Sequence, residues 1–548
     1  MILLVIDTLR ADHVGCYGYE RETTPGIDRI AASGIRYENA FTTAPWTLPA
    51  FGSILTSSYP WEHGAVNDYL ALRRDLPTLA RTLADHGYET AAFVSHIYTS
   101  RTYGFAEGFH RFEDFRIGEE YRFDQGREPR AEVVIRAALD WLGARKSTKP
   151  FFLWIHLFDP HWEYDAPEPY RTLFDGEYAG HMDGSYESIA PFFSPDSAPA
   201  PRDLHHLVAL YDGEIQYADA WVDTLVRALR EGGEWERTAM IVTADHGEEF
   251  NDHGSMGHSF TFYDEVLRVP LVLRRPGGQH AGSIVEKPVS LLDIFPTVMD
   301  LTGTPPPRGL GGNRLPGPSA DETISRDLLA GTIREGRYGR SLLRGTTKLI
   351  WEGGAFSLFD RAEDPCEVKN LYGTEGAGTI DLVDGMIASS GGSGWTVEWP
   401  ETPGDAHRYE GSVEPSGVVV EILPLSGATF HLEATNNRSF RFSALTAEAG
   451  GVRFRVVSPD APIRFHLSID GKEDPDLLYI GRDLFHPPSA SFGLDPTRSP
   501  EGALSSPPAP PRSLPHMQVS KGDDPPPPPA IDLTAAEEER LRALGYFR

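Results

Sequence analysis

The sequence predicts an α/β fold in which a mostly parallel sheet is flanked by helices, followed by a small C-terminal antiparallel β-sandwich. Three observations support this prediction. Short apolar runs alternate with helical patterns, acidic side chains follow several of those runs, and the last third of the chain changes to period-2 alternation. Uninterrupted aliphatic runs are typical of strands that are buried on both faces, as in parallel sheets.

The predicted strands of the first domain are short apolar runs at 2–6, 90–94, 151–155, 239–243 and 269–273. Helical patterns lie between them at 76–87, 131–142 and 210–231. Strands that alternate with helices indicate parallel pairing, and ligand groups gather beyond the carboxyl ends of such strands. Asp7, Asp159 and Asp245 stand at these ends.

The pattern changes after about residue 375. A Gly-rich stretch precedes five alternating segments, which are 417–423, 429–434, 439–445, 451–457 and 463–469. Their spacing predicts an antiparallel sandwich. A Pro-rich stretch and a short helix with a Thr534–Glu537 capping box follow. We expect a main domain over 1–375, a sandwich of unassigned role over 395–495, a linker over 496–531 and a terminal helix over 532–548.

Composition excludes some classes of function. The 548 residues include 50 Lys plus Arg against 80 Asp plus Glu, a formal net charge of −30. This surplus repels phosphate backbones and anionic lipid, so we do not expect a nucleic-acid partner. An anionic substrate therefore needs a local positive centre, such as a metal. The two cysteines, Cys16 and Cys366, cannot form a disulfide framework and leave the redox compartment undecided.

A targeting signal is not recognisable at the start of the sequence. The apolar run 1–6 is too short for a signal peptide or a membrane span, and no basic segment precedes it. Taken literally, this predicts a cytoplasmic protein without a membrane span. The first residues already have the pattern of a core strand. The alternative is therefore that an upstream signal is missing from this start, which predicts a periplasmic or secreted protein.

Asp7, Asp245 and His246 are the candidate metal ligands. Asp7 ends the first strand, and Asp245 and His246 closely follow the strand 239–243, so all three can reach one cation. Two carboxylates and an imidazole suit Zn²⁺ or Mn²⁺ better than Ca²⁺, which prefers oxygen alone. The alternative is that Asp245 and His246 are turn and capping residues. We predict one divalent metal ion.

Thr47 is the candidate nucleophile. It opens a helical pattern that has Pro49 in its first turn. A hydroxyl at the positive end of a helix, beside free backbone N–H groups, favours a bound phosphate or sulfate. A metal on the same oxygen lowers its pKa and generates an alkoxide, so Thr47 is also a predicted metal ligand. The alternative is that Thr47 only caps the helix.

Two histidines complete the predicted catalytic groups. His161 and His258 follow a strand or a Gly turn, and they are predicted to bind ester oxygens or to protonate the leaving group. Four other histidines lie in suggestive turns and rank lower: His63, which we interpret as loop architecture, His96, His156 and His253. Arg10 and Asp159 are the predicted substrate-binding residues, with a surface salt bridge as the alternative for Arg10.

Together these segments resemble the sulfatase family of the alkaline phosphatase superfamily. The segments that carry the resemblance are 5–12, 23–30, 47–64, 243–270 and 348–371, and the ending "LRALGY" resembles the family's as well. The resemblance covers roughly residues 1–372. It implies metal ligands at Asp7, Asp245 and His246, the nucleophile at Thr47, and ester-binding groups at His161 and His258.

The departures from the family pattern concern the nucleophile. Sulfatases oxidise a Cys or Ser to formylglycine, and Thr47 cannot form that aldehyde. The arginine of the signature is Phe51 here, and Thr8 stands where the family has a second aspartate. A threonine nucleophile resembles superfamily members that act on phosphorus instead.

The sequence therefore predicts a metal-dependent hydrolase of sulfate or phosphate esters, acting on a small-molecule, glycan-derived or lipid-derived anionic ester. One alternative is a phosphodiester or phosphonate ester hydrolase, or a transferase of phosphorylated head groups, the latter expected to carry a membrane anchor. Another is a non-catalytic pseudo-sulfatase that binds a glycan or a partner and need not hold stoichiometric metal. The organic half of the substrate and the oligomeric state stay open.

Overall fold

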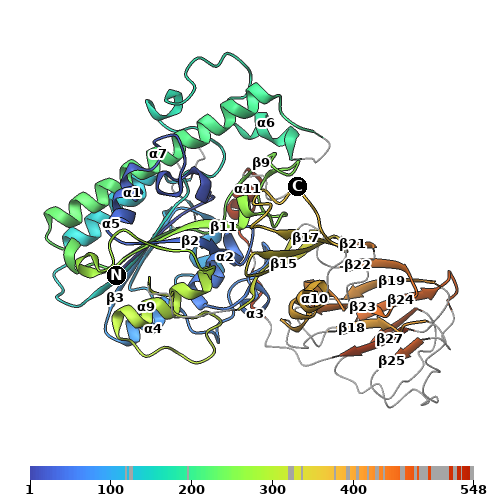
Figure 1. The fold of residues 1–548 in the computed structure, drawn as a ribbon. Helices are drawn as coiled ribbons and strands as arrows, with labels where there is room; N and C mark the ends of the chain where they lie inside the picture. The colour runs from blue at the N-terminus through green and yellow to red at the C-terminus, as the bar shows by residue number, and fades with distance from the viewer. Residues whose placement is uncertain are drawn as a thin grey trace.

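The computed structural model describes most of the chain (Figure 1). The residues outside the description are 118–119, 122–127, 194–196, 319–325, 335–336, 375–377, 390–394, 403–405, 416–418, 426–430, 436–438, 457–462, 474–477, 481–490, 495–516, 522–527, 532 and 544–548. Within the described residues, we find no helix that combines the length and the apolar character needed to cross a bilayer.

A nine-stranded sheet forms the centre of the first domain. Its order is β12 (Ser283–Val285), β2 (Ile35–Phe41), β11 (Arg268–Arg274), β8 (Met240–Ala244), β1 (Ile2–Ile6), β7 (Phe151–Leu157), β3 (Glu89–Val94) and β4 (Arg111–Glu113), and β13 (Val289–Ser290) also pairs with β2. The pairs β1–β7, β1–β8, β3–β7 and β3–β4 are parallel. The predicted mostly parallel α/β fold is confirmed, although β11 runs antiparallel to β8 and β2.

Helices cover both faces of this sheet (Figure 1). On one face lie α1 (Pro25–Ala32), α5 (Ala131–Ala144) and the 31-residue α7 (Pro201–Glu231), which pack against one another. On the other face lie α2 (Thr47–Thr56), α4 (Leu79–Asp85) and α9 (Ile294–Thr302). Every residue of α2 is buried, as expected for a helix that carries no charged side chain.

Strand β1 positions the predicted site. All five of its residues are fully buried, and it lies between β7 and β8 in the middle of the sheet. Ile6 pairs with Leu157 on one side and with Ala244 on the other, so the three strands end at the same level. The residues that follow these strands therefore emerge together at one edge of the sheet.

A second, antiparallel sheet contains β14 (Leu328–Arg334), β15 (Arg337–Arg344), β16 (Thr347–Glu352) and β17 (Ala355–Asp360). The shorter elements are α3 (Pro60–His63), β5 (Arg116–Ile117), β6 (Glu120–Tyr121), α6 (Tyr186–Ile189), β9 (Glu249–Phe250), β10 (Met256–Gly257), α8 (Asp264–Leu267) and α10 (Gly378–Ala388).

Two five-stranded sheets follow in the described part of the C-terminal region. One has the order β20 (Val419–Pro424), β23 (Gly450–Val456), β18 (Trp395–Trp399), β27 (Met517–Lys521), β25 (Leu478–Ile480). The other has the order β21 (His431–Thr435), β22 (Ser439–Thr446), β19 (His407–Pro415), β24 (Ile463–Ile469), β26 (Ser491–Leu494). All strand pairs are antiparallel except β25–β27, and rings such as Phe440 and Phe454 meet between the sheets. The five alternating segments correspond to β20–β24.

The linker prediction requires 496–531 to be a spacer along its whole length, but part of this stretch forms a strand. Met517–Lys521 forms β27, which pairs with β18 inside a sheet, and Ala530 pairs with Leu70. The reason is that Met517 and Val519 alternate with polar residues and are buried, a short signal that the surrounding prolines conceal. The rest of the predicted linker lies largely outside the described residues, and the other domain boundaries stay predictions.

The terminal helix α11 (Ala535–Ala543) returns to the first domain (Figure 1). The capping box has the predicted contacts, since Thr534 N donates to Glu537 Oε2 at 2.8 Å and Glu537 N donates to Thr534 Oγ1 at 3.3 Å. The second oxygen of Glu537 accepts a hydrogen bond from Thr102 Oγ1 at 2.6 Å, which attaches the helix to the loop after β3. Residues 544–548 of the predicted helix lie outside the described part.

Candidate active site

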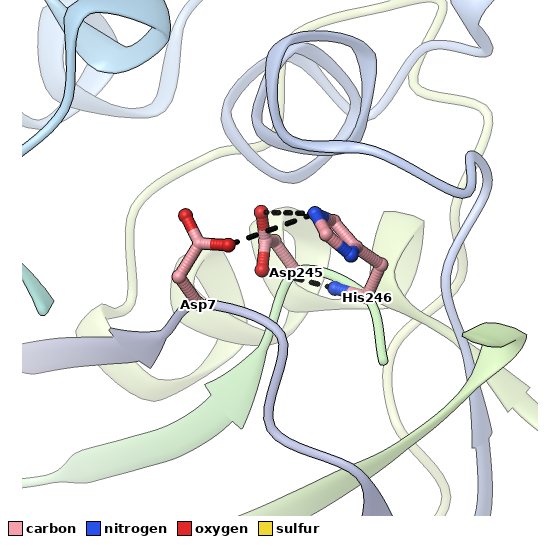
Figure 2. A group of neighbouring side chains, drawn as sticks. All are labelled: Asp7, Asp245 and His246. Atoms are coloured by element: carbon pink, nitrogen blue, oxygen red, sulfur yellow. Dashed lines mark hydrogen bonds and ion pairs between the residues drawn. The ribbon is translucent and has the colours of Figure 1, made fainter. Parts of the chain in front are cut away.

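Three side chains with metal-ligand atoms meet at the carboxyl edge of the central sheet (Figure 2). Asp7 follows β1, while Asp245 and His246 follow its parallel neighbour β8. The ligand atoms of the three residues lie within 4.8 Å of one another, and all three side chains are fully buried. His246 Nε2 lies 3.3 Å from Asp245 Oδ2 and 3.7 Å from Asp7 Oδ1.

The charges of this cluster favour a cation. Asp7 Oδ1 and Asp245 Oδ2 are buried and have no hydrogen-bond partner among the described residues. Burial raises the pKa of Asp245 to about 8. Burial, and then the charge of Asp245, raise the pKa of Asp7 well above its ordinary value. Two buried carboxylates are costly unless an opposite charge compensates them, so a divalent cation would remove this cost.

The histidine and the ligand spacing also fit a metal. His246 Nδ1 lies 2.9 Å from Gly247 O, which can only accept, so Nδ1 carries the proton and Nε2 presents a lone pair to the carboxylates. Burial lowers the pKa of His246, which keeps the ring neutral. Two ligands at ~2.05 Å from a tetrahedral zinc ion lie about 3.3 Å apart. The donor set therefore fits a divalent metal.

Thr47 faces this cluster from the start of α2. Its Oγ1 lies 3.3 Å from His246 Nε2, and its side chain is buried. The N-cap of α2 is Trp46, and no side-chain capping bond is present there. The hydroxyl of Thr47 is therefore directed to the candidate metal ligands and does not act as a helix cap.

Backbone and side-chain donors hold the second oxygen of each aspartate. His156 Nε2 lies 3.0 Å from Asp7 Oδ2, and the N–H groups of Thr8 and His246 donate to Asp245 Oδ1 at 3.3 and 3.0 Å. His156 ranks low from sequence alone. Its signal is a polar residue inside an apolar strand, and β7 places it opposite Val5 in β1, next to Asp7.

His161 and His258 lie beside the cluster, close to each other. The ring centre of His258 is 4.5 Å from that of His246 and 4.9 Å from that of His161. His258 Nδ1 contacts Glu248 Oε1 at 3.0 Å, so a buried carboxylate orients this ring. Burial, and then the nearby Arg334, lower the pKa of His258 to about 3.

Two further residues reach the same neighbourhood. His96, which ranks low from sequence, is buried with its ring 6.2 Å from that of His161. Arg334, at the end of β14, lies 4.0 Å above the ring of Trp46 and donates to Ser259 Oγ at 3.1 Å. No local sequence signal identifies Arg334, because only the packing of the second sheet brings it beside Thr47.

The predicted substrate-binding residues have structural contacts instead. All five N–H groups of the Arg10 guanidinium have partners, on Asp12, Asp252 and the carbonyl of Glu248, and the side chain is buried. It is therefore an internal brace of the loop after β8, not the surface salt bridge of the alternative. Asp159 Oδ2 accepts a hydrogen bond from Ala131 N at 2.8 Å and caps α5. Within the described residues these contacts are structural, and a role of Arg10 and Asp159 in substrate binding stays a prediction.

The lower-ranked His63 has the expected structural role. It is fully buried, its Nε2 lies 3.1 Å from Pro49 O, and burial lowers its pKa to about 3. Its ring packs so closely on Gly52 that a Cβ there would lie 2.5 Å from it. His63 therefore fixes α2 behind Thr47.

Known proteins with similar sequences include sulfatases. "Uncharacterized sulfatase YidJ" of Escherichia coli is 24% identical over 68% of this chain and 82% of its own length. "Arylsulfatase K" of Bos taurus is 26% identical over 75% and 83%. The "Multifunctional alkaline phosphatase superfamily protein PehA" of Trinickia caryophylli is 26% identical over 58% and 76%.

Solved structures share the fold. The phosphonate monoester hydrolase of Agrobacterium radiobacter superposes with a TM-score of 0.58 at 20% identity, covering 71% of this chain and 94% of its own. A protein solved with its substrate D-glucosamine-2-N,6-O-disulfate has a TM-score of 0.58 at 19% identity, covering 68% and 93%. The family profile described as Sulfatase matches residues 1–304, more than half of the 548-residue chain. The chain belongs to the sulfatase family.

Proposed function

We propose that this protein is a metal-dependent hydrolase of sulfate or phosphate esters in which Thr47 is the nucleophile. The observation that carries the proposal is the position of Thr47 Oγ1, 3.3 Å from His246 Nε2, beside the buried oxygens of Asp7 and Asp245 that have no hydrogen-bond partner among the described residues. The sulfatase family membership supports the reaction class.

Asp7, Asp245, His246 and Thr47 are the residues that would hold the metal. A divalent cation there would supply Lewis acidity toward the ester and the Thr47 hydroxyl. Thr47 is the first residue of α2, so the free backbone N–H groups of the first helical turn lie beside its hydroxyl and would stabilise the negative charge that develops on the transferred group.

The chemical steps then follow from the residues of the chain. The Thr47 hydroxyl gives its proton to water and its oxygen attacks sulfur or phosphorus, while the bond to the leaving oxygen breaks. Burial lowers the pKa of His258 and raises that of Glu248, so the carboxyl of Glu248 donates to Nδ1 of a neutral ring whose proton is on Nε2. The leaving oxygen takes this Nε2 proton. Water then attacks the same sulfur or phosphorus and releases the hydroxyl of Thr47 with inorganic sulfate or phosphate. Thr47 has no aldehyde hydrate that could expel the group by C–O cleavage.

A second candidate is the hydrolysis of phosphodiesters or phosphonate monoesters. The likeness to a phosphonate monoester hydrolase favours it, as does a threonine nucleophile. It uses the same residues and differs only in the substituent on phosphorus.

The test uses the full chain loaded with Mn²⁺ or Zn²⁺ and three substrates: an aryl sulfate, an aryl phosphate diester and an aryl phosphonate monoester. We expect turnover of at least one, and Thr47→Ala to lower kcat by about 10³-fold or more. Thr56→Ala, a buried threonine at the other end of α2, is the matched control. Full activity of Thr47→Ala, or no turnover by the wild type, would contradict the proposal.

Metal analysis separates the enzyme from a pseudoenzyme. We expect about one equivalent of divalent metal in the wild type, and its loss in the double variant Asp7→Asn/Asp245→Asn. A protein that binds no metal under these conditions is a pseudo-sulfatase.

A further inference from the structure

Three aromatic rings lie together in the part of the chain between β7 and α7. They are Trp162, Tyr186 and Phe193. The ring centres of Trp162 and Tyr186 are 5.6 Å apart, those of Trp162 and Phe193 are 5.4 Å apart, and those of Tyr186 and Phe193 are 6.1 Å apart. Each ring contacts the other two, so they form one aromatic wall.

This aromatic wall is continuous with the histidines of the candidate site. The ring centre of Trp162 lies 5.0 Å from that of His161 and 6.5 Å from that of His258. Phe193 packs on the backbone of Gly257, where a Cβ would lie 3.3 Å from its ring, and Gly257 has a φ of +88° that favours glycine. Because Gly257 has no Cβ, Phe193 can pack directly on the backbone next to His258.

The wall is only partly covered by the protein. Trp162 is buried, whereas Tyr186 and Phe193 are half-buried against the core, so part of each of these two residues stays accessible. The backbone N–H of Tyr186 donates to Glu163 Oε1 at 3.0 Å, which fixes the segment at the outer end of the wall. Open aromatic surface beside convergent polar groups is typical of a ligand subsite.

We propose that Trp162, Tyr186 and Phe193 form the subsite for the organic half of the ester, and that this half carries a ring that packs against Tyr186 and Phe193. This inference rests on the proposed function, in which His258 faces the leaving oxygen. The aromatic wall begins at Trp162, whose ring is next to that of His258. The shared chemistry is a flat C–H or π face, which an aryl group or a pyranose supplies and a short alkyl chain does not.

The experiment compares three esters of whichever acid the wild type hydrolyses: the ethyl ester, the benzyl ester and the 6-O-ester of methyl glucoside. We expect Tyr186→Ala/Phe193→Ala to lower kcat/KM tenfold or more for at least one ring-bearing ester and less than twofold for the ethyl ester. A loss confined to the benzyl ester identifies an aryl group, and a loss confined to the glucoside identifies a sugar. The matched control is Tyr178→Ala, an aromatic residue of the same segment that stacks on His206 instead.

A binding measurement tests the subsite independently of turnover. Calorimetric titration of the Mn²⁺-loaded protein with benzylphosphonate and ethylphosphonate should give a tighter Kd for the benzyl compound, and the double variant should remove the difference. The variant Tyr186→Leu/Phe193→Leu keeps apolar volume and serves if the alanine variant does not fold.

The outcomes that overturn the two proposals differ. The subsite would be overturned if the double variant loses activity equally on ethyl and ring-bearing esters, or loses none on any ester. It would also be overturned if the wild-type protein binds both phosphonates equally or binds neither. Absence of turnover with all esters would overturn the proposed function, while the titrations still decide the subsite.

Discussion

Asp7 and Asp245 each have one oxygen fixed by the protein and one oxygen directed to the candidate metal position. His156 fixes Asp7, and the backbone N–H groups of Thr8 and His246 fix Asp245. Partners of this kind orient metal ligands and adjust their affinity, although they do not contact the ion. In each aspartate, the oxygen that the protein does not hydrogen-bond is therefore the one available to a metal ion.

His156→Ala should weaken metal binding by about 10- to 100-fold, because Asp7 loses the donor that orients its carboxylate. The measurement is a competition titration of Zn²⁺ against a chelator of known affinity. The exposed His86, whose Nδ1 contacts the carbonyl of Thr82, gives the control variant His86→Ala. An unchanged Zn²⁺ affinity in His156→Ala would show that Asp7 needs no such partner.

Glu248→Ala should affect esters with poor leaving groups more than esters with good ones. Glu248 orients His258, and a proton donor matters most when the leaving oxygen is strongly basic. We expect a loss in kcat of about tenfold or more for an alkyl ester and a smaller loss for a 4-nitrophenyl ester. Equal losses for both esters would assign Glu248 to structure alone, and partial rescue by Glu248→Gln would support the orienting role.

Among the secondary-structure elements, the loop between β8 and α8 carries Asp245, His246 and His258. His253 of the same loop holds it in place through two hydrogen bonds. His253 Nδ1 donates to Glu265 Oε1 at 2.6 Å and Nε2 donates to Cys366 O at 3.0 Å. Burial lowers the pKa of His253, but the hydrogen bond and charge of Glu265 outweigh it and raise the pKa to about 9. The charged imidazole thus connects this loop to the segment after β17.

This contact should make stability depend on pH. The pKa of His253 is higher in the folded state than its ordinary value of 6.5, so its contribution is complete below pH ~6.5 and is lost as pH rises through about 9. The difference in Tm between the wild type and His253→Gln should therefore shrink from pH 6 to pH 10. A difference that stays constant over this range would show that His253 is not charged in the folded protein.

The elements also show where sequence patterns suffice. The continuous run of β1 and the alternating β24 could be predicted because burial alone sets their patterns. The sequence of β2 does not predict a strand, since its Arg-Tyr-Glu-Asn centre gives no regular alternation and its pairing with β11 contains a register shift. The first turns of α7 lack a helical pattern because residues 201–206 are mainly polar, and Arg202 and His206 contact Asp175 there.

At the scale of the whole molecule, the C-terminal sheets are joined to the first domain through buried charge. Arg340 of β15 donates to Glu421 of β20, and Arg455 of β23 lies 3.5 Å from the second oxygen of Glu421. The guanidinium of Arg340 also lies 3.6 Å above the ring of Trp61 in α3, the helix that follows α2. The sheets therefore support the region that holds Thr47.

Glu421→Ala should lower the free energy of unfolding by about 3–5 kcal/mol, because Arg340 stays buried without its carboxylate. The measurement is the Tm of the full chain and its denaturation by urea. Glu398→Ala, an exposed glutamate on β18 of the same sheet, is the control and should have little effect. A loss below about 1 kcal/mol in Glu421→Ala would mean that the buried ion network does not join the two parts.

The mostly parallel sheet and the polar residues at its carboxyl edge, Asp7, Asp245 and His246, follow from local sequence patterns. The reason is that apolar runs must be buried and the polar residues that end them emerge together. The contacts of His156 with Asp7, of Arg10 and Asp159 with neighbouring loops, and of Arg334 and the aromatic wall with the site become visible only in the folded chain. These contacts join segments far apart in the chain, and no local pattern records which side chains of distant segments will meet.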